Sequence, residues 1–336
     1  MDGVLEESVS PLVSHVPGAA NVVDDETTPT AAHYGDPLVE HQRLSRSVGI
    51  TDRWDRTAIL VKGEETHTWL NDLISQKINA IEPGQATYGL LLDIQGRVTH
   101  QFGIASLPEG ILLDCPMRDA DSLADYLTKM IFWARVEVEV LQLAQLTLVS
   151  GLLPDSDAAG SLTASSASEE LRAALGSGED AAGAKGLDSN SLVEAILAIP
   201  GAHSWRMRSM AAVGNEPSAS NIGALDIWVP RGEVTAAWDV LSEVAAPAGR
   251  MAYDALRIAA HIPEVGIDTD ERTIPHEAAF FTGPRTAEAT KLGSEADGPS
   301  PYAVHLNKGC YRGQETVSRV QNLGKPPRVI VLVHLD

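Results

Sequence analysis

Three apolar segments that follow one another closely constrain the fold more than any other feature of this chain. They are ATYGLLLD, RVTHQFGIAS and GILLDC, at residues 86–93, 97–106 and 110–115. Turn-forming residues in IQG and LPEG separate them, so the pattern predicts three neighbouring strands in a β-meander. A segment with helical periodicity precedes the meander at residues 64–75, and another follows it at residues 119–133.

The order of the remaining segments favours an α+β class over a regularly alternating α/β fold. The strand patterns RVEVEVLQ and QLTLVSG close a first α+β unit, which we predict at residues 34–150. A second α+β unit is predicted at residues 190–327, from SLVEAILAIPG through the strand patterns HSWRMRSMAAV and ALDIWVP to the helix pattern GEVTAAWDVLSEVA. Residues 328–336 then begin an apolar strand pattern, which we interpret as the start of a further, truncated domain.

Segments with few apolar residues predict mobile parts of the chain. Residues 1–33 mix acidic residues, proline and threonine without periodicity, and we predict a disordered N-terminal tail there. Residues 151–189 are rich in alanine, serine, glycine and acidic residues, which predicts a mobile acidic insertion with one helical turn around ELRAAL. A similar composition at residues 283–299 predicts a second mobile stretch.

Composition and charge exclude several classes of function. The chain has 25 Lys and Arg against 46 Asp and Glu, a formal net charge of −21, so its field repels nucleic acid. No apolar stretch approaches the length of a membrane helix, and the acidic N-terminus does not resemble a secretory signal, so we expect a cytoplasmic protein without membrane contact. The histidines and the two cysteines show no metal-ligand spacing, and no glycine-rich phosphate loop is present.

The octapeptide KGCYRGQE, at residues 308–315, has no apolar periodicity and is the strongest candidate site. Lys308 and Arg312 lie within two residues of Cys310 and would favour its thiolate form. Gly309 and Gly313 permit close backbone approach, and the residues after them are expected to begin a helix. Cys310 is therefore either an inert, packed cysteine or a functional thiol, and the spacing does not separate a nucleophile from a redox group or a ligand.

Two other segments have simpler interpretations. LLDIQGRV predicts a turn between two strands with Asp93, Gln95, Gly96 and Arg97, and Gly96 alone explains this turn. Cys115 follows the apolar run GILLD, has no charged neighbours comparable to those of Cys310, and is expected to be packed. The tryptophans fall mostly on apolar faces and are individually expected in the core.

The octapeptide fits the pattern K-G-C-Y-x-G-Q-E, and there the chain resembles the YgfZ family, the folate-binding relatives of the glycine cleavage T-protein. LLDIQGRV, LRIAAHIPEVGIDTDERTIPHEA and the segment from GEETHTWLNDLIS to INAIEPGQATYG look like the same family. The resemblance implies a multidomain ring around a central channel that holds tetrahydrofolate or a derivative, completed by a C-terminal β-barrel that is mostly missing from this chain. It also implies a role with iron–sulfur enzymes or their assembly factors.

The resemblance assigns Cys310 as the catalytic residue. The folate-binding residues that it assigns lie in the two motifs: Lys308, Gly309, Tyr311, Arg312, Gly313, Gln314, Glu315, Asp93 and Arg97. The motif pattern implies no metal ligand.

Three functions remain open at this point. The first is a tetrahydrofolate-binding accessory protein for iron–sulfur enzymes that acts through Cys310. The second is an aminomethyltransferase, but the catalytic aspartate of the T-protein aligns with His100 or Gln101, and no carboxylate in SNIGALDIW takes the place of its pterin-binding glutamate. The third is a non-catalytic folate-binding scaffold in which Lys308 and Arg312 hold the glutamate tail.

Overall fold

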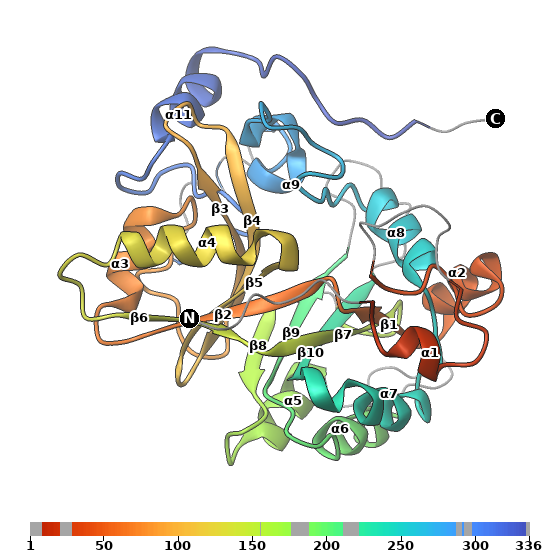
Figure 1. The fold of residues 1–336 in the computed structure, drawn as a ribbon. Helices are drawn as coiled ribbons and strands as arrows, with labels where there is room; N and C mark the ends of the chain where they lie inside the picture. The colour runs from red at the N-terminus through yellow and green to blue at the C-terminus, as the bar shows by residue number, and fades with distance from the viewer. Residues whose placement is uncertain are drawn as a thin grey trace.

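The computed structural model describes residues 9–20, 29–154, 156–175, 188–210, 222–286, 291 and 298–333. Two β-sheets with helices on their outer faces form its centre (Figure 1). In sheet order, the first consists of β3 (Ala86–Leu92), β4 (Val98–Leu107), β5 (Gly110–Pro116), β2 (Arg56–Lys62) and β6 (Glu137–Leu141). The second consists of β11 (Ala246–Pro247), β1 (Gly49–Arg53), β7 (Leu143–Ser150), β10 (Gly223–Pro230), β9 (Ser204–Ser209) and β8 (Ala158–Ser161).

The first sheet confirms the predicted β-meander, since β3, β4 and β5 are neighbours and pair antiparallel. The helices α3 (Thr66–Leu73) and α4 (Met117–Lys129) cover its outer face (Figure 1). Leu70 and Leu123 from these helices pack with Phe102 of β4 in one apolar core, where all three are fully buried. Residues on alternate positions, such as Gly103, therefore face the second sheet.

The second sheet is built from strands of both predicted units. Strands β1 and β7, from the unit predicted at 34–150, pair in one sheet with β8, β9 and β10, and the predicted boundary at residue 150 falls between β7 and β8 of that sheet. The helices α5 (Ala167–Leu175), α6 (Ser189–Leu197) and α7 (Val234–Ser242) cover its outer face. Strand pairing in this sheet therefore joins segments that are distant in the sequence.

The N-terminal segment is more ordered than predicted. Residues 9–20 include the short helix α1 (Leu12–His15), and Leu12 is fully buried in the core under α7. Residues 31 and 32 accept hydrogen bonds from the backbone N–H groups of Arg250 and Met251, and the absence of a side chain at Gly249 gives them room. A few apolar residues are enough to hold a segment whose composition predicted disorder; residues 1–8 and 21–28 lie outside the described residues.

The first half of the predicted acidic insertion also has regular structure. Residues 158–161 form the edge strand β8, which pairs with β9, and α5 buries Leu171 and Leu175 against the second sheet. The predicted helical turn around ELRAAL is thus part of a longer packed helix. Residues 155 and 176–187 of the predicted insertion lie outside the described residues, as do residues 287–290 and 292–297 of the second predicted mobile stretch.

Helices from both the N-terminal and the C-terminal parts of the chain pack beside the two sheets. Helices α2 (Pro37–Arg46) and α8 (Arg250–Ala259) contact each other beside β1, and α9 (Ala279–Thr282) and α11 (Gln314–Leu323) lie near the meander (Figure 1). Two short 3-10 helices span Arg231–Glu233 and Pro275–Glu277.

The described residues that follow α11 run extended along the surface. The strand predicted from residue 328 is not formed within the described residues 328–333, because no neighbouring strand pairs with it; the Ile330 N–H instead donates to the Glu277 carbonyl. The predicted ring and barrel remain predictions.

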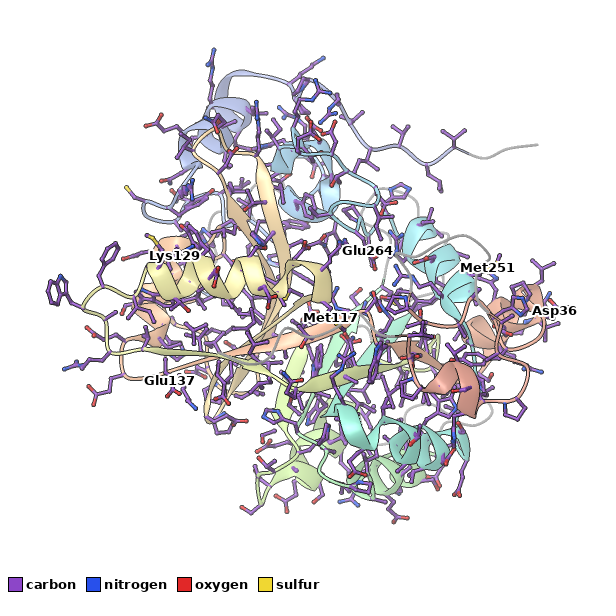
Figure 2. The ribbon with its side chains drawn as sticks, in the orientation of Figure 1. Asp36, Met117, Lys129, Glu137, Met251 and Glu264 are labelled. Atoms are coloured by element: carbon purple, nitrogen blue, oxygen red, sulfur yellow. The ribbon has the colours of Figure 1, made fainter. Side chains whose placement is uncertain are left out.

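One turn departs from the expectation that tryptophans are buried. The turn between Lys129 and Glu137, both labelled in Figure 2, carries Phe132 and Trp133, which are 77% and 96% exposed. Trp205, Trp228 and Trp238 are buried as expected. Among the residues that the structure describes, no helix is long and apolar enough to span a membrane.

Candidate functional site

The two sequence motifs meet at a contact between two glycines. Gly313 adopts a left-handed conformation, with φ of +79°, immediately before α11, and Gly96 has φ of +77° in the β3–β4 turn. A Cβ atom on Gly313 would lie 2.5 Å from the Asp93 carbonyl oxygen and 2.9 Å from the Gly96 Cα atom. Both glycines are therefore required by backbone conformation and by close approach.

Side chains around this contact stabilise the turn and the helix. The Asp93 Oδ1 atom accepts hydrogen bonds of 2.8 Å from the backbone N–H groups of Gln95 and Arg97, which closes the turn. The Thr316 hydroxyl donates to the Gln95 carbonyl oxygen at 2.6 Å, from the first turn of α11. The Asp93 backbone thus lies beside the octapeptide, and the Asp93 carboxylate is used within its own turn.

Lys308 points into the protein and holds the C-terminal end of α3. Its side chain is buried, and its Nζ atom donates to the backbone carbonyls of Asn71, Ile74 and Gln76, the last two at 2.8 Å. A cation at this end of a helix is favourable because the free carbonyls there carry partial negative charge. Burial nevertheless lowers the pKa of the Lys308 ammonium to about 7. In this arrangement Lys308 faces carbonyl oxygens rather than an open cavity.

The rest of the octapeptide divides between the core and the surface. Tyr311 is buried, with the Lys308 Nζ atom 5.1 Å from its ring centre, and Gln314 donates a hydrogen bond to the Lys308 carbonyl. Cys310 is exposed, and the Arg312 guanidinium lies 5.6 Å from the ring centre of Tyr126 on α4. Gly309 and Glu315 are also exposed. Cys115 is fully buried, as predicted, and burial raises the pKa of its thiol to about 12.

A second site, which the sequence analysis missed, lies between the two sheets. The interior of this cleft is narrow, with a volume of about 50 Å³, and it widens to about 540 Å³ when the solvent space at its mouth is included. The side chains on the facing surfaces follow the period of two along each strand. On β9, Arg206 and Arg208 face the first sheet, while Trp205 and Met207 pack under the helices. The described residues that line the cleft include five arginines and two carboxylates: Arg53, Arg56, Arg206, Arg208, Arg257, Asp114 and Glu264.

One ion-pair network joins the two sheets across the cleft. Arg206 of β9 pairs with Asp114 of β5 and, at 2.8 Å, with Asp226 of β10. Its guanidinium occupies the space above Gly103, where a Cβ atom would collide with it. Arg208 also binds Asp226 at 2.8 Å, and these arginines hold the pKa of the Asp226 carboxyl well below its usual range against the opposing effect of burial. The carboxylates of Asp114 and Asp226 therefore remain ionised, and both are paired with arginines.

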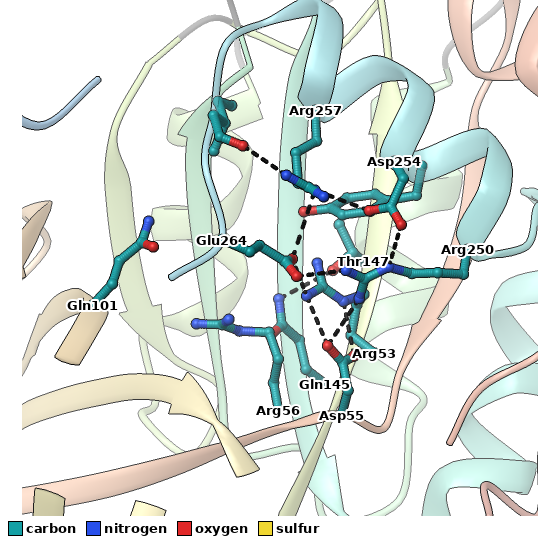
Figure 3. Close-up of polar contacts among 12 residues, drawn as sticks. Arg53, Asp55, Arg56, Gln101, Gln145, Thr147, Arg250, Asp254, Arg257 and Glu264 are labelled. Carbon is teal, nitrogen blue, oxygen red and sulfur yellow. Dashed lines mark hydrogen bonds and ion pairs between the residues drawn. The ribbon is translucent and has the colours of Figure 1, made fainter. Parts of the chain in front are cut away.

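A second network closes the other side of the cleft (Figure 3). Glu264 binds Arg53 at 3.0 Å and Arg250 at 2.5 Å, and Asp55 binds both of these arginines at 2.9 Å. Burial opposes ionisation of Glu264, but the two arginines lower its pKa to about 2. Each carboxylate that lines the described part of the cleft is thus bound by at least two arginines.

Three polar atoms of the cleft lining have no hydrogen-bond partner although they are buried. They are the Tyr88 hydroxyl, Gln145 Oε1 and Arg206 Nε. A buried donor or acceptor without a partner costs about 1–3 kcal/mol, and most such groups in proteins are paired. A polar ligand held against this lining would supply partners for these atoms.

The structure separates the two residues that align with the catalytic aspartate of the T-protein. Gln101 lines the cleft, lies to the left of Glu264 in Figure 3, and accepts a hydrogen bond from the Val265 N–H at 3.2 Å. His100 lies on the α4 side of the same strand, where its Nε2 atom is 2.8 Å from the Ser122 hydroxyl. Burial lowers the pKa of His100 to about 4, so its imidazole is neutral near pH 7.

None of the predicted site residues is among the described residues that line the cleft. The sequence did contain a signal for it: charged or polar residues alternate with apolar ones in SWRMRS and QLTLVS, as they do in half-buried strands. The alternation marks the polar faces of these strands but does not show that the two faces meet in one cleft.

The comparisons with known proteins all find relatives of one class of protein, the aminomethyltransferases. A family profile described as the GCVT N-terminal domain matches residues 30–149. An aminomethyltransferase of Xylella fastidiosa (strain 9a5c) is 25% identical over 266 residues, which is 78% of this chain and 66% of that protein. One from Nitrosococcus oceani is 33% identical over 85 residues, which is 25% of this chain and 23% of that protein. This chain therefore spans at most about two thirds of these relatives.

A solved structure agrees with the sequence comparisons. The glycine cleavage system aminomethyltransferase T from Bartonella henselae superimposes with a TM-score of 0.56 at 18% identity, over 86% of this chain and 67% of that chain. The chain thus has an aminomethyltransferase-like fold that includes a region similar to the GCVT N-terminal domain.

Proposed function

We propose that this chain binds a reduced folate in the cleft between the two sheets. The observation that carries the proposal is the set of unpartnered polar atoms on Tyr88, Gln145 and Arg206 in the cleft lining. A pterin ring offers hydrogen-bond donors and acceptors in one plane, and the carboxylates of a glutamate tail suit an arginine-rich wall. The aminomethyltransferase-like fold supports the choice of folate over other polar ligands.

A calorimetric titration of the full chain with tetrahydrofolate tests this proposal. Gln145→Leu removes one unpartnered acceptor without breaking an ion pair, and we expect it to weaken binding by about 10-fold. The control is Gln95→Leu on the exposed β3–β4 turn, which should bind like the unmodified chain. Absence of saturable binding, or equal affinity for the Gln145→Leu variant, would contradict folate binding in this cleft.

The names of the relatives suggest aminomethyl transfer, and we expect this chain to perform little of it. Transfer needs negative charge or a general base near the folate nitrogen, and such a group is typically worth about 10²–10⁴ in rate. Gln101 is neutral, and Asp114 and Glu264 are each bound by two arginines or more. The assay is release of ammonia and methylenetetrahydrofolate from an aminomethyl-lipoyl carrier, and rapid release would contradict this expectation.

A role for Cys310 in maintaining iron–sulfur enzymes is a second proposal. It is supported by the exposed thiol of Cys310 beside the motif contact, in contrast to the buried Cys115. Cys310→Ser should lower the activity of iron–sulfur enzymes in the host under oxidative stress and leave folate binding unchanged. A host with Cys310→Ser that keeps full activity of these enzymes would instead favour a non-catalytic folate-binding scaffold.

A further inference from the structure

The unpartnered donors of the cleft indicate the chemistry of the group that they bind. We propose that the reduced folate held there carries a formyl group, whose carbonyl oxygen accepts hydrogen bonds from the Tyr88 hydroxyl and Arg206 Nε. This inference rests on the proposed function, because it names the one-carbon state of the ligand of the same cleft. A formyl-bearing folate differs from the folate of aminomethyl chemistry, in which the one-carbon unit is derived from an amine.

Both atoms are available as donors. Arg206 is 4% exposed, and its two terminal nitrogens are used by Asp114 and Asp226 while its Nε atom has no partner. The Tyr88 hydroxyl is also buried and without a partner, and burial raises its pKa, so the phenol keeps its proton. Two unpaired donors require an acceptor on the ligand.

The two donors belong to side chains that are neighbours in the cleft lining. Tyr88 on β3 is opposite Gly103 on β4, and Gly103 is opposite Asp114 on β5. The Arg206 guanidinium crosses from the second sheet to the space above Gly103, and its Cζ atom is 5.7 Å from the centre of the Tyr88 ring. Phenol and guanidinium thus border the same part of the cleft, on either side of a residue without a side chain.

The charge of the lining favours oxygen over a cationic group. The described lining contains five arginines and two carboxylates, and each of these arginines is paired with a carboxylate in or behind the lining. Asp114 and Glu264 are already bound by arginines, so neither offers free negative charge to a cationic one-carbon unit. A neutral carbonyl oxygen suits such a lining, because it accepts hydrogen bonds from both donors without adding a charge.

The test compares two ligands that differ little in size. Calorimetry should show that the full chain binds 5-formyltetrahydrofolate more tightly than 5-methyltetrahydrofolate, by about 10-fold or more, since two hydrogen bonds to the formyl oxygen separate them. Tyr88→Phe should reduce this preference to a few-fold, because only Arg206 Nε then remains to donate, and it should weaken binding of the formyl form more than binding of the methyl form. Tyr34→Phe is the matched control, because the Tyr34 hydroxyl is also buried and unpartnered but Tyr34 does not line the cleft.

The remaining outcomes separate this inference from the proposed function. Equal affinity for the formyl and methyl forms, or a preference that Tyr88→Phe leaves undiminished, would overturn the inference and leave folate binding intact. Equal weakening of both forms by Tyr88→Phe would also overturn it and assign the acceptor to the pterin oxo group. If Tyr88→Phe weakens binding of p-aminobenzoylglutamate alone by the same factor, the acceptor is a tail carboxylate and the inference fails. Binding of no folate would refute the proposed function itself.

Discussion

Replacement of Asp52 by asparagine is expected to remove a pH-dependent loss of stability. Asp52 is 2% exposed on the helix-covered face of the second sheet, where its Oδ1 atom accepts a hydrogen bond from the Trp54 N–H and its Oδ2 atom has no partner. Burial raises the pKa of this carboxyl from 3.8 to about 7, and Asp55 adds to the shift. A hydrogen bond from Ser10 and the charge of Arg231 oppose it.

The sign of the effect follows from the direction of this shift. Because the folded state raises the pKa, it binds the proton more tightly than the unfolded chain, and the free energy of unfolding falls as the pH rises from about 4 to about 7. A shift from 3.8 to about 7 corresponds to about 4 kcal/mol, since one pKa unit is worth about 1.4 kcal/mol. The neighbouring Tyr34 phenol adds no charge in this range, because burial raises its pKa further above its ordinary value.

Urea unfolding at pH 5 and pH 8 measures the effect. At pH 8 we expect Asp52→Asn to be more stable than the unmodified chain by up to about 4 kcal/mol, and at pH 5 we expect a much smaller difference. Asp125→Asn on the exposed surface of α4 is the control, and it should give the same small difference at both values. A difference between Asp52→Asn and the unmodified chain that does not change with pH would refute the reasoning.

The same unfolding measurement checks three further expectations. Lys308→Met should cost about 3 kcal/mol, because it leaves three backbone carbonyls without their ammonium donor, and a loss below 1 kcal/mol would contradict a stabilising role. Gly313→Ala should cost about 2 kcal/mol, since φ is +79° and its Cβ would lie 2.5 Å from a carbonyl oxygen, whereas Gly309→Ala meets nothing within 4 Å and should be nearly neutral. Cys115→Ser should cost about 1–3 kcal/mol through an unpaired buried hydroxyl, and Cys310→Ser should cost almost nothing; equal losses would be inconsistent with their different burial.

Local features of the sequence determined the local structure. The meander follows from alternating apolar residues and turn residues, and α11 begins directly after Gly313 as the octapeptide predicted. The burial of Cys115 and the left-handed turn at Gly96 follow from the same kind of short-range pattern. These features depend on residues within about ten positions of one another, so the sequence alone carries them.

The tertiary structure decided which distant segments meet. It pairs β1 and β7 with β9 and β10 in one sheet, and it turns Lys308 inward to the end of α3 instead of toward a ligand. The cleft depends on this pairing, because its arginines come from strands and helices that are far apart in the chain. Arg206 is stable in a buried position only because Asp114 and Asp226 reach it from two other strands. A buried charge is compensated in three dimensions by residues that the sequence around it does not specify.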